Sequence, residues 1–228
     1  MPYLVLTAIL LALALLPSLH VRRTLRRHGE PRGDLPGTGA ELARHLIERF
    51  GIEGVTVERA EARRDHYDPR ARAVRLGPDV HDGRSLTAVA VAAHEVGHAL
   101  QFAREEPVSR LRGRWLPFAN ALKKGGILLL ALLPLVGIVT KAPVALVALV
   151  GLSLAMQLGG ALAYLIVLPE EWDASFNKAM PILRAGEYVE ERDLPAVESV
   201  LRAAAWTYFA RALADLVNIG RWALILRR

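Results

Sequence analysis

The sequence contains no cysteine among its 228 residues. This absence excludes disulfides, CxxC zinc sites, iron–sulfur clusters and thiol nucleophiles, so any metal site must use His, Asp or Glu. Hydrophobic residues, in contrast, make up 53% of the chain, although 23% of residues are charged and the mean hydropathy is +0.26. A soluble domain with this many charges usually has a negative mean hydropathy. The apolar residues must therefore be concentrated in particular segments.

The first apolar segment is Tyr3–Leu19, which carries no charge and is just long enough to cross a bilayer. No basic stretch precedes it, whereas four arginines lie between Arg22 and Arg27. A signal peptide has the opposite order. We therefore expect an uncleaved anchor whose basic flank lies in the cytoplasm, as the positive-inside rule requires.

The second apolar segment runs from Gly125 to Leu168 and is interrupted only at Lys141–Pro143. Its two halves, Gly125–Thr140 and Pro143–Leu168, predict a transmembrane hairpin with a very short outer loop. Arginines and lysines precede the hairpin, which agrees with the orientation of the first segment.

The C-terminal region, about Val197–Leu226, is apolar but is interrupted by several charges. Arg211 and Asp215 are four residues apart, so they share a helix face and could pair. The region fits a fourth span with inward-facing charges or a helix lying in the membrane interface. We expect a membrane-embedded helix and leave these two alternatives open.

The net charge of +6 would suit nucleic acid or an anionic membrane surface. Most of the basic residues flank the apolar segments instead of gathering on one folded face. We therefore predict that the partners are the lipid bilayer and a protein or peptide substrate, and that nucleic acid is not a partner.

A polar segment between Pro31 and Lys124 predicts a small folded domain. Thr38 and Glu41 form a capping-box pattern that opens a helix reaching about Phe50. Alternating residues predict two strands, Val55–Glu58 and Ala71–Leu76. A second helix, from Leu86 to about Arg104, is expected to begin after a Ser85 cap.

That second helix contains His94-Glu-Val-Gly-His98. Residues i and i+4 lie on one helix face, so both imidazoles can bind a single metal ion. Glu95 lies on a neighbouring face, where it can hold a water without being a ligand. This HExxH arrangement is typical of zinc peptidases. It predicts Zn²⁺ as the cofactor, His94 and His98 as ligands, and Glu95 as the catalytic base.

Two histidines leave a catalytic zinc one protein ligand short. No histidine follows His98, so the third ligand must be a carboxylate downstream or a group upstream. The best downstream candidates are Glu170, Glu171 and Asp173, in the first turn of a helix that we expect to begin at Pro169. Acids at this place also suit the helix dipole without any metal.

Several motifs together resemble one family. They are Asp65-His-Tyr-Asp-Pro69, Gly83-Arg-Ser85, Val91-Ala-Ala-His-Glu-Val-Gly-His-Ala-Leu-Gln101, Glu171-Trp-Asp-Ala-Ser175 and Ala204-Ala-Trp-Thr-Tyr208. This combination is similar to the bacterial neutral zinc metallopeptidases of the YugP type, membrane proteins of similar size.

The similarity extends to glutamate-zincins, including membrane peptidases of the HtpX and CAAX-processing type, and implies Glu171 as the third ligand. Those relatives carry an acid four residues after the ligand Glu, where this chain has Ser175. The departure leaves Asp173 as either a partner of a ligand histidine or a rival ligand. Glu170, about 100° away on the helix, is expected to face solvent.

In the expected mechanism, zinc polarises the scissile carbonyl and acidifies a water, and Glu95 takes the proton. His66, Tyr67 and Tyr208 are candidates for an additional oxyanion donor. The strand at Ala71–Leu76 precedes the zinc helix as the edge strand does in zincins, so an extended substrate could add to it; ordinary sheet packing explains it equally well. The competing hypothesis is a catalytically inactive membrane scaffold with a structural zinc site.

These observations predict a mainly α protein with multi-span membrane helices and a small α+β zincin-like cytoplasmic domain. We expect an N-terminal transmembrane anchor (1–20), a zincin-like domain with the HExxH helix (21–124), a transmembrane hairpin (125–168), a helix carrying the third zinc ligand (169–196) and a C-terminal membrane-embedded helix (197–228). The function expected is that of a membrane-embedded zinc endopeptidase in the bacterial inner membrane, multi-pass, with its site on the cytoplasmic side.

Overall fold

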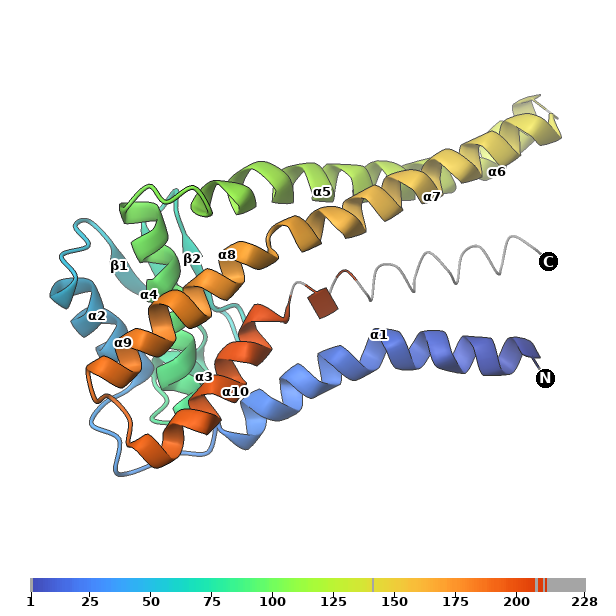
Figure 1. The fold of residues 1–228 in the computed structure, drawn as a ribbon. Helices are drawn as coiled ribbons and strands as arrows, with labels where there is room; N and C mark the ends of the chain where they lie inside the picture. The colour runs from blue at the N-terminus through green and yellow to red at the C-terminus, as the bar shows by residue number, and fades with distance from the viewer. Residues whose placement is uncertain (1, 141, 208, 211, 213–228) are drawn as a thin grey trace. The chain divides into compact units, whose positions relative to one another are not determined.

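The computed structural model describes residues 2–140, 142–207, 209, 210 and 212 (Figure 1). The described chain is mainly helical, with one three-stranded sheet. Its elements are α1 (Pro2–Arg27), α2 (Gly39–Arg49), β1 (Thr56–Arg59), β2 (His66–Asp68), β3 (Ala73–Leu76), α3 (Pro78–His81), α4 (Leu86–Ala103), α5 (Ser109–Ala131), α6 (Leu133–Thr140), α7 (Pro143–Ile166), α8 (Leu168–Trp172), a π-helix (Asp173–Ala179), α9 (Met180–Ala185), a 3₁₀ turn (Glu191–Asp193) and α10 (Leu194–Ala205).

The chain divides into two compact units. One combines Leu19–Arg110 with Pro169–Thr207, and we call it the folded unit. The other combines Met1–Ser18, Leu111–Leu168 and Tyr208–Arg228, and we call it the apolar unit. The two segments of the folded unit are separated in sequence by the whole predicted hairpin, so α4 and the helix that follows the hairpin belong to one core.

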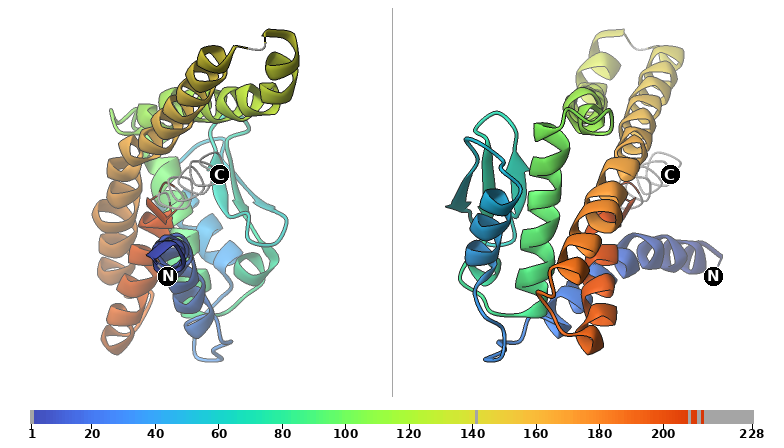
Figure 2. Two further views of the ribbon diagram at one scale, coloured as in Figure 1. Left: turned by 90° about the vertical axis from the view of Figure 1, so that its right-hand side faces the viewer. Right: turned by 60° about the vertical axis from the view of Figure 1, so that its left-hand side comes forward.

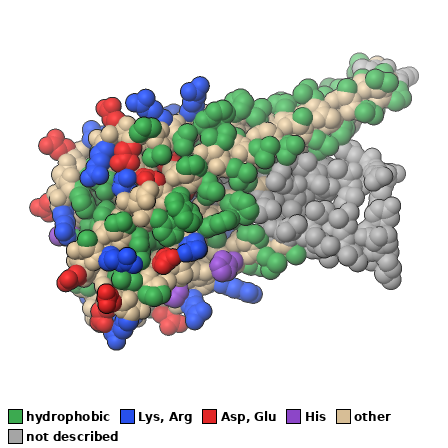
Figure 3. Space-filling view, in the orientation of Figure 1, with side chains coloured by type: hydrophobic (Ala, Val, Ile, Leu, Met, Phe, Trp, Pro, Cys, Tyr) green, Lys and Arg blue, Asp and Glu red, His purple; other side chains and the backbone are tan. Residues whose placement is uncertain are grey.

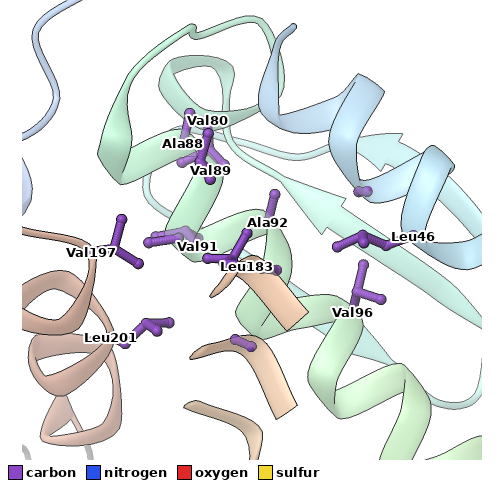
Figure 4. Packing of buried hydrophobic residues seen from close by; sticks show 14 of the residues in the cluster. Leu46, Val80, Ala88, Val89, Val91, Ala92, Val96, Leu183, Val197 and Leu201 are labelled. Atoms are coloured by element: carbon purple, nitrogen blue, oxygen red, sulfur yellow. The ribbon is translucent and has the colours of Figure 1, made fainter. Parts of the chain in front are cut away.

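Helix α4 is the centre of the folded unit. Its side chains are buried continuously from Leu86 to Gln101. Helix α2 and the sheet cover one side of α4, and the π-helix, α9 and α10 cover the other (Figure 2). The small residues of α4 allow this close packing from several sides. Aliphatic side chains from these elements fill the core between them, as Figure 4 shows for Leu46 beside Val96 and for Leu201 near Val197.

Side-chain caps determine where two of the helices begin, as the sequence predicted. The Thr38 hydroxyl accepts from the Glu41 N–H at 3.2 Å, and the Glu41 carboxylate accepts from the Thr38 N–H at 2.7 Å, which confirms the capping box. The Ser85 hydroxyl accepts from the Ala88 N–H at 3.1 Å and caps α4. Both helices therefore begin where side-chain oxygens satisfy backbone N–H groups that have no partner within the helix.

The sheet has the strand order β1-β3-β2, with β1 parallel and β2 antiparallel to β3. The two predicted strands are present as β1 and β3, whereas β2 was not predicted. Because β3 pairs on both sides, the expectation that Ala71–Leu76 forms an edge strand is wrong. The edge strand next to β3 on the antiparallel side is β2, whose three residues are too few to give an alternating pattern.

The predicted hairpin region is helical, but its boundaries differ from those expected. Helix α5 begins at Ser109, well before Gly125, and is bent by 43° relative to α6 at the break after Ala131. Helix α7 is followed by α8 after the single residue Val167, so α8 begins at Leu168 instead of opening at Pro169. Among the described residues, one helix, Pro143–Ala185, is long and apolar enough to cross a membrane, or two if the bent pair α5–α6 is one span.

Polar contacts and close approaches hold the hairpin helices together within the apolar unit. The Ser153 hydroxyl donates to the Gly126 carbonyl at 2.6 Å, and the Tyr164 hydroxyl donates to Asn120 at 2.8 Å. A Cβ on Gly126 would lie 2.8 Å from the Ser153 carbonyl oxygen, so α5 and α7 touch through their backbones. Small residues with interhelical hydrogen bonds are typical of helix packing in membranes.

The C-terminal prediction is covered only in part. Within the predicted segment 197–228, residues up to Ala205 belong to α10, and Val197, Val200 and Leu201 are fully buried in the core of the folded unit. Residues 208, 211 and 213–228 lie outside the described residues, and with them the predicted pair of Arg211 and Asp215 and the choice between a span and an interfacial helix.

Candidate metal and catalytic site

The site is built on α4, where His94 and His98 are one helical turn apart. Both side chains are buried, and their Nε2 atoms lie 3.2 Å from each other. The ring planes are nearly perpendicular, at 82°, with centroids 4.7 Å apart. The two imidazoles thus direct the same ring atom to one point, as the four-residue spacing predicted.

Glu171 completes the cluster from α8. Its Oε2 lies 3.3 Å from His94 Nε2 and 3.5 Å from His98 Nε2, and only 2% of the residue is exposed. A tetrahedral zinc with bonds of about 2.0–2.1 Å places neighbouring ligand atoms about 3.3 Å apart. The three atoms therefore form a triangle of the size that zinc requires, and the nitrogen and oxygen donors suit this metal.

Glu95 is buried beside the cluster but faces the sheet. Its Oε2 accepts a hydrogen bond of 2.8 Å from the backbone N–H of Tyr67. The three candidate ligand atoms are those of His94, His98 and Glu171, and Glu95 is not part of that group. Glu95 therefore follows the candidate ligand His94 directly in the sequence, and strand β2 holds its carboxylate.

The candidates for an oxyanion donor have different settings. The Tyr67 side chain is buried against Phe102, with ring centroids 5.5 Å apart, and burial raises the pKa of its phenol. His66 Nδ1 lies 2.7 Å from the Arg64 carbonyl, so one ring nitrogen is used locally. Tyr208 lies outside the described residues.

Gln101 is a site residue that the sequence analysis did not single out. Its Oε1 lies 2.9 Å from His98 Nδ1, on the side of the ring that faces away from the cluster. Its Nε2 donates to Asp173 Oδ2 at 2.8 Å and to the Glu170 carbonyl at 3.0 Å. Asp173 therefore reaches the histidine through Gln101. The only sequence signal was position, since Gln101 follows His98 by three residues on the same helix.

Ser175 has the corresponding contact with the other histidine. Its hydroxyl lies 3.0 Å from His94 Nδ1 and donates to the Leu201 carbonyl at 3.2 Å. The π-helix places Ser175 and Glu171 on the same buried side, next to α4, and π-helical segments are frequent at functional sites.

The expectation that Glu170 faces solvent is wrong. Its side chain is 0% exposed, and its Oε1 lies 3.9 Å from His98 Nδ1. Glu170 and Glu171 do point in different directions, as neighbours on a helix must, but α8 is buried widely enough that both directions lead into the protein.

Asp65 is a further acid near Glu95. Burial raises the pKa of Asp65; the hydrogen bond of 2.8 Å that its Oδ1 accepts from the Gly77 N–H opposes the rise, and the negative charge of Glu95 adds to it. The loop before β2 and the start of α3 are joined by this contact. The candidate site is thus bordered by acids on α4, on α8 and in this loop.

Comparison with known proteins places the chain in a family. The family described as "Putative neutral zinc metallopeptidase" matches residues 3–227. The chain is also 33% identical over 233 residues to "Putative membrane protease YugP" of Bacillus subtilis (strain 168), covering 99% of this chain and 96% of that protein. No solved structure matches the chain. The zinc-peptidase family and the triangle of His94, His98 and Glu171 together confirm Zn²⁺ as the cofactor. The chain belongs to the family of neutral zinc metallopeptidases that includes YugP.

Proposed function

We propose that the protein is a membrane-embedded zinc endopeptidase in which His94, His98 and Glu171 hold the metal and Glu95 is the catalytic base. The observation that carries the proposal is the convergence of three buried ligand atoms, 3.2–3.5 Å apart. A further buried carboxylate, Glu95, directly follows the ligand His94 and is not one of the three. A purely structural zinc site is usually closed by four protein ligands and has no use for such a carboxylate.

The chemistry requires a group that takes and returns a proton. Zinc, when bound, polarises the scissile carbonyl and acidifies the attacking water. Glu95 takes the proton from that water and passes it to the leaving amine. The Tyr67 N–H holds one carboxylate oxygen of Glu95 at 2.8 Å and leaves the other oxygen for this transfer. Fixing the carboxylate in this way lowers the cost of orienting it during the reaction.

Strand β2 is the place where an extended substrate would bind. Tyr67 gives its N–H to Glu95, so this strand borders the catalytic carboxylate. Strand β3 is unavailable because it is paired on both sides. A peptide added along β2 would be held mainly by backbone hydrogen bonds, which predicts loose selectivity for substrate side chains.

The apolar unit is proposed to place this site at a bilayer. Large apolar side chains are widely exposed on α5, α6 and α7, including Leu128 at 59%, Ile138 at 73% and Val144 at 81% (Figure 3). Exposed apolar surface of this extent is stable in lipid but not in water. The relative from Bacillus subtilis carries "membrane protease" in its name, which supports the same location.

The orientation follows from the basic flanks. Arginines between Arg22 and Arg27, and again between Arg110 and Arg114, border the predicted spans. The positive-inside rule therefore puts the folded unit in the cytoplasm of a multi-pass inner-membrane protein, acting on protein or peptide substrates near the membrane. Cysteines introduced at Arg32 and Lys141 should react with an impermeant thiol reagent from opposite sides. Labelling of both from one side would contradict this topology.

Peptidase activity is tested by proteolysis of an unfolded protein substrate at matched zinc content. Glu95→Gln should retain zinc and lose activity on the order of a hundredfold or more, as expected for a general base. Glu48→Gln, the same change at an exposed position on α2, is the control and should be fully active. Equal activity of Glu95→Gln and wild type would remove Glu95 from the mechanism. Absence of hydrolysis in the wild type would favour the inactive scaffold.

A further inference from the structure

We infer that Gln101 and Ser175 are positioning residues that fix the tautomers of the two ligand histidines, so that both Nε2 lone pairs face the metal. The inference rests on the proposed ligand set. It follows from which groups around each histidine can donate a hydrogen bond and which can only accept one.

The orientation of the Gln101 amide is determined by its neighbours. Its nitrogen lies 3.0 Å from the Glu170 carbonyl and 2.8 Å from Asp173 Oδ2, and both of these oxygens are acceptors. Asp173 also accepts from Lys178 at 3.0 Å and from Asn177 at 2.7 Å, so both of its carboxyl oxygens already face donors. Turning the amide over would set its carbonyl oxygen against two acceptors at hydrogen-bond distance. The NH₂ group must therefore face Asp173 and the oxygen must face His98.

The oxygen of Gln101 can only accept, so the hydrogen of the 2.9 Å contact belongs to His98 Nδ1. A neutral imidazole carries one hydrogen, which leaves a lone pair on His98 Nε2. The chain from Asp173 through Gln101 thus specifies the tautomer that binds a metal. The amide links Asp173 to the ring without a direct contact between Asp173 and His98.

Ser175 specifies the tautomer of His94 in the same way. Its hydroxyl has one hydrogen, and the Leu201 carbonyl at 3.2 Å can only accept it. The lone pairs of the hydroxyl are then available to His94 Nδ1 at 3.0 Å, so Nδ1 carries the ring hydrogen. Ser175 therefore orients the His94 ring through these two contacts.

Both assignments agree with the centre of the cluster. With the ring hydrogens on Nδ1, each of the two Nε2 atoms, which lie 3.2 Å apart, carries a lone pair. The Glu171 oxygen beside them is a third hydrogen-bond acceptor. Three acceptors at this separation repel one another and attract a cation. The outer hydrogen bonds thus prepare the site for a metal.

The direct test is nuclear magnetic resonance of metal-free protein labelled with ¹⁵N-histidine, at a pH where the imidazoles are neutral. Two-bond ¹H–¹⁵N correlations distinguish a ring with hydrogen on Nδ1 from one with hydrogen on Nε2. His94 and His98, assigned by the signals lost in their alanine variants, should both show the Nδ1–H pattern. The Nε2–H pattern for either in the wild type would overturn the inference for that residue.

Variants test the cause. Gln101→Leu should abolish the fixed Nδ1–H pattern of His98 and weaken zinc binding by about 10–100-fold, the usual effect of losing an orienting partner. Asn177→Leu is the matched control, because it also removes a hydrogen bond to Asp173 without touching the ring, and it should change neither readout. Ser175→Ala should act on His94 in the same way, with Ser199→Ala, whose hydroxyl contacts only the Ala196 carbonyl 2.7 Å away, as its control.

A variant of similar length separates orientation from packing. Gln101→Met keeps a long side chain at this buried position but presents no amide oxygen to His98. It should lose the fixed Nδ1–H pattern and zinc affinity as Gln101→Leu does, whereas a role in packing alone would leave both close to wild type. Wild-type zinc affinity in both Gln101→Leu and Ser175→Ala would overturn the inference. The wild-type tautomers require no variant and no activity, so they remain decisive if a variant misfolds or if the peptidase assignment fails.

Discussion

Gly97 lies between the two ligand histidines in sequence, and its missing side chain lets the π-helix approach α4. A Cβ at this position would lie 2.8 Å from the Ala174 carbonyl oxygen and 3.3 Å from Lys178 Cβ. The first of these atoms is backbone, so it cannot rotate away. Ordinary contact begins at 3.4 Å, so Gly97→Ala requires the π-helix to move about 0.6 Å from α4.

This movement is small for folding but large for metal binding. Overpacking typically lowers the free energy of unfolding by about 1–3 kcal/mol. Replacing a helical glycine with alanine raises it by about 1 kcal/mol, because alanine has the higher helix propensity. The free energy of unfolding should therefore fall by no more than about 2 kcal/mol. Metal–ligand distances, however, are held within about 0.2 Å. Because Ala174 lies between Glu171 and Ser175 in sequence, we expect zinc affinity to fall at least about tenfold.

The assay is competition for zinc with a chromophoric chelator, together with calorimetric melting of the metal-free protein. Gly113→Ala is the control, because among the described residues no atom outside its own turn of helix lies within 4 Å of the added Cβ. It should leave zinc affinity unchanged and raise helix stability by up to about 1 kcal/mol. Wild-type zinc affinity in Gly97→Ala would refute the argument that this close approach sets the position of Glu171.

Three further predictions follow from buried groups. Glu170→Ala should lower the free energy of unfolding by about 2 kcal/mol or more, because loss of a fully buried side chain leaves a cavity; an unchanged melting temperature would contradict the buried setting of Glu170. Asp65 has a raised pKa in the folded state, so its contribution to stability is greatest when it is protonated and falls as the pH rises through the unfolded and then the folded pKa. Asp65→Asn should therefore be more stable than wild type at neutral pH and no more stable at a pH below both values, as pH-dependent melting would show. Gly126→Ala should separate α5 from α7, because its Cβ would lie 2.8 Å from the Ser153 carbonyl oxygen, and should lower the melting temperature in detergent; unchanged melting would contradict the backbone contact.

Local chemistry explains which parts of the fold could be predicted. The capping box at Thr38 and the Ser85 cap depend on contacts across three residues, and both are formed. The pairing of His94 with His98 depends only on helical periodicity. Strand β2 was missed because three residues, His66–Asp68, carry no alternation, and their conformation depends on pairing with β3.

The surroundings of the histidines could not be predicted because they depend on distant parts of the chain. Gln101 and Asp173 are 72 residues apart, and Ser175 lies 81 residues from His94. The sequence offered Glu170, Glu171 and Asp173 as candidates for the third ligand, and only the resemblance selected Glu171 among them. The burial of Glu170 depends on how widely α8 is covered by other elements, which the spacing of acids on one helix does not show.

Zinc content measured on one set of purified variants tests the central claim most directly. Wild type and Glu95→Gln should each contain about one zinc per chain, since Glu95 is not a ligand. His94→Ala, His98→Ala and Glu171→Ala should each lose the metal, while the exposed-site control Glu48→Gln keeps it. Full zinc in any of the three ligand variants, or loss of zinc in Glu95→Gln, would contradict the assignment of the site.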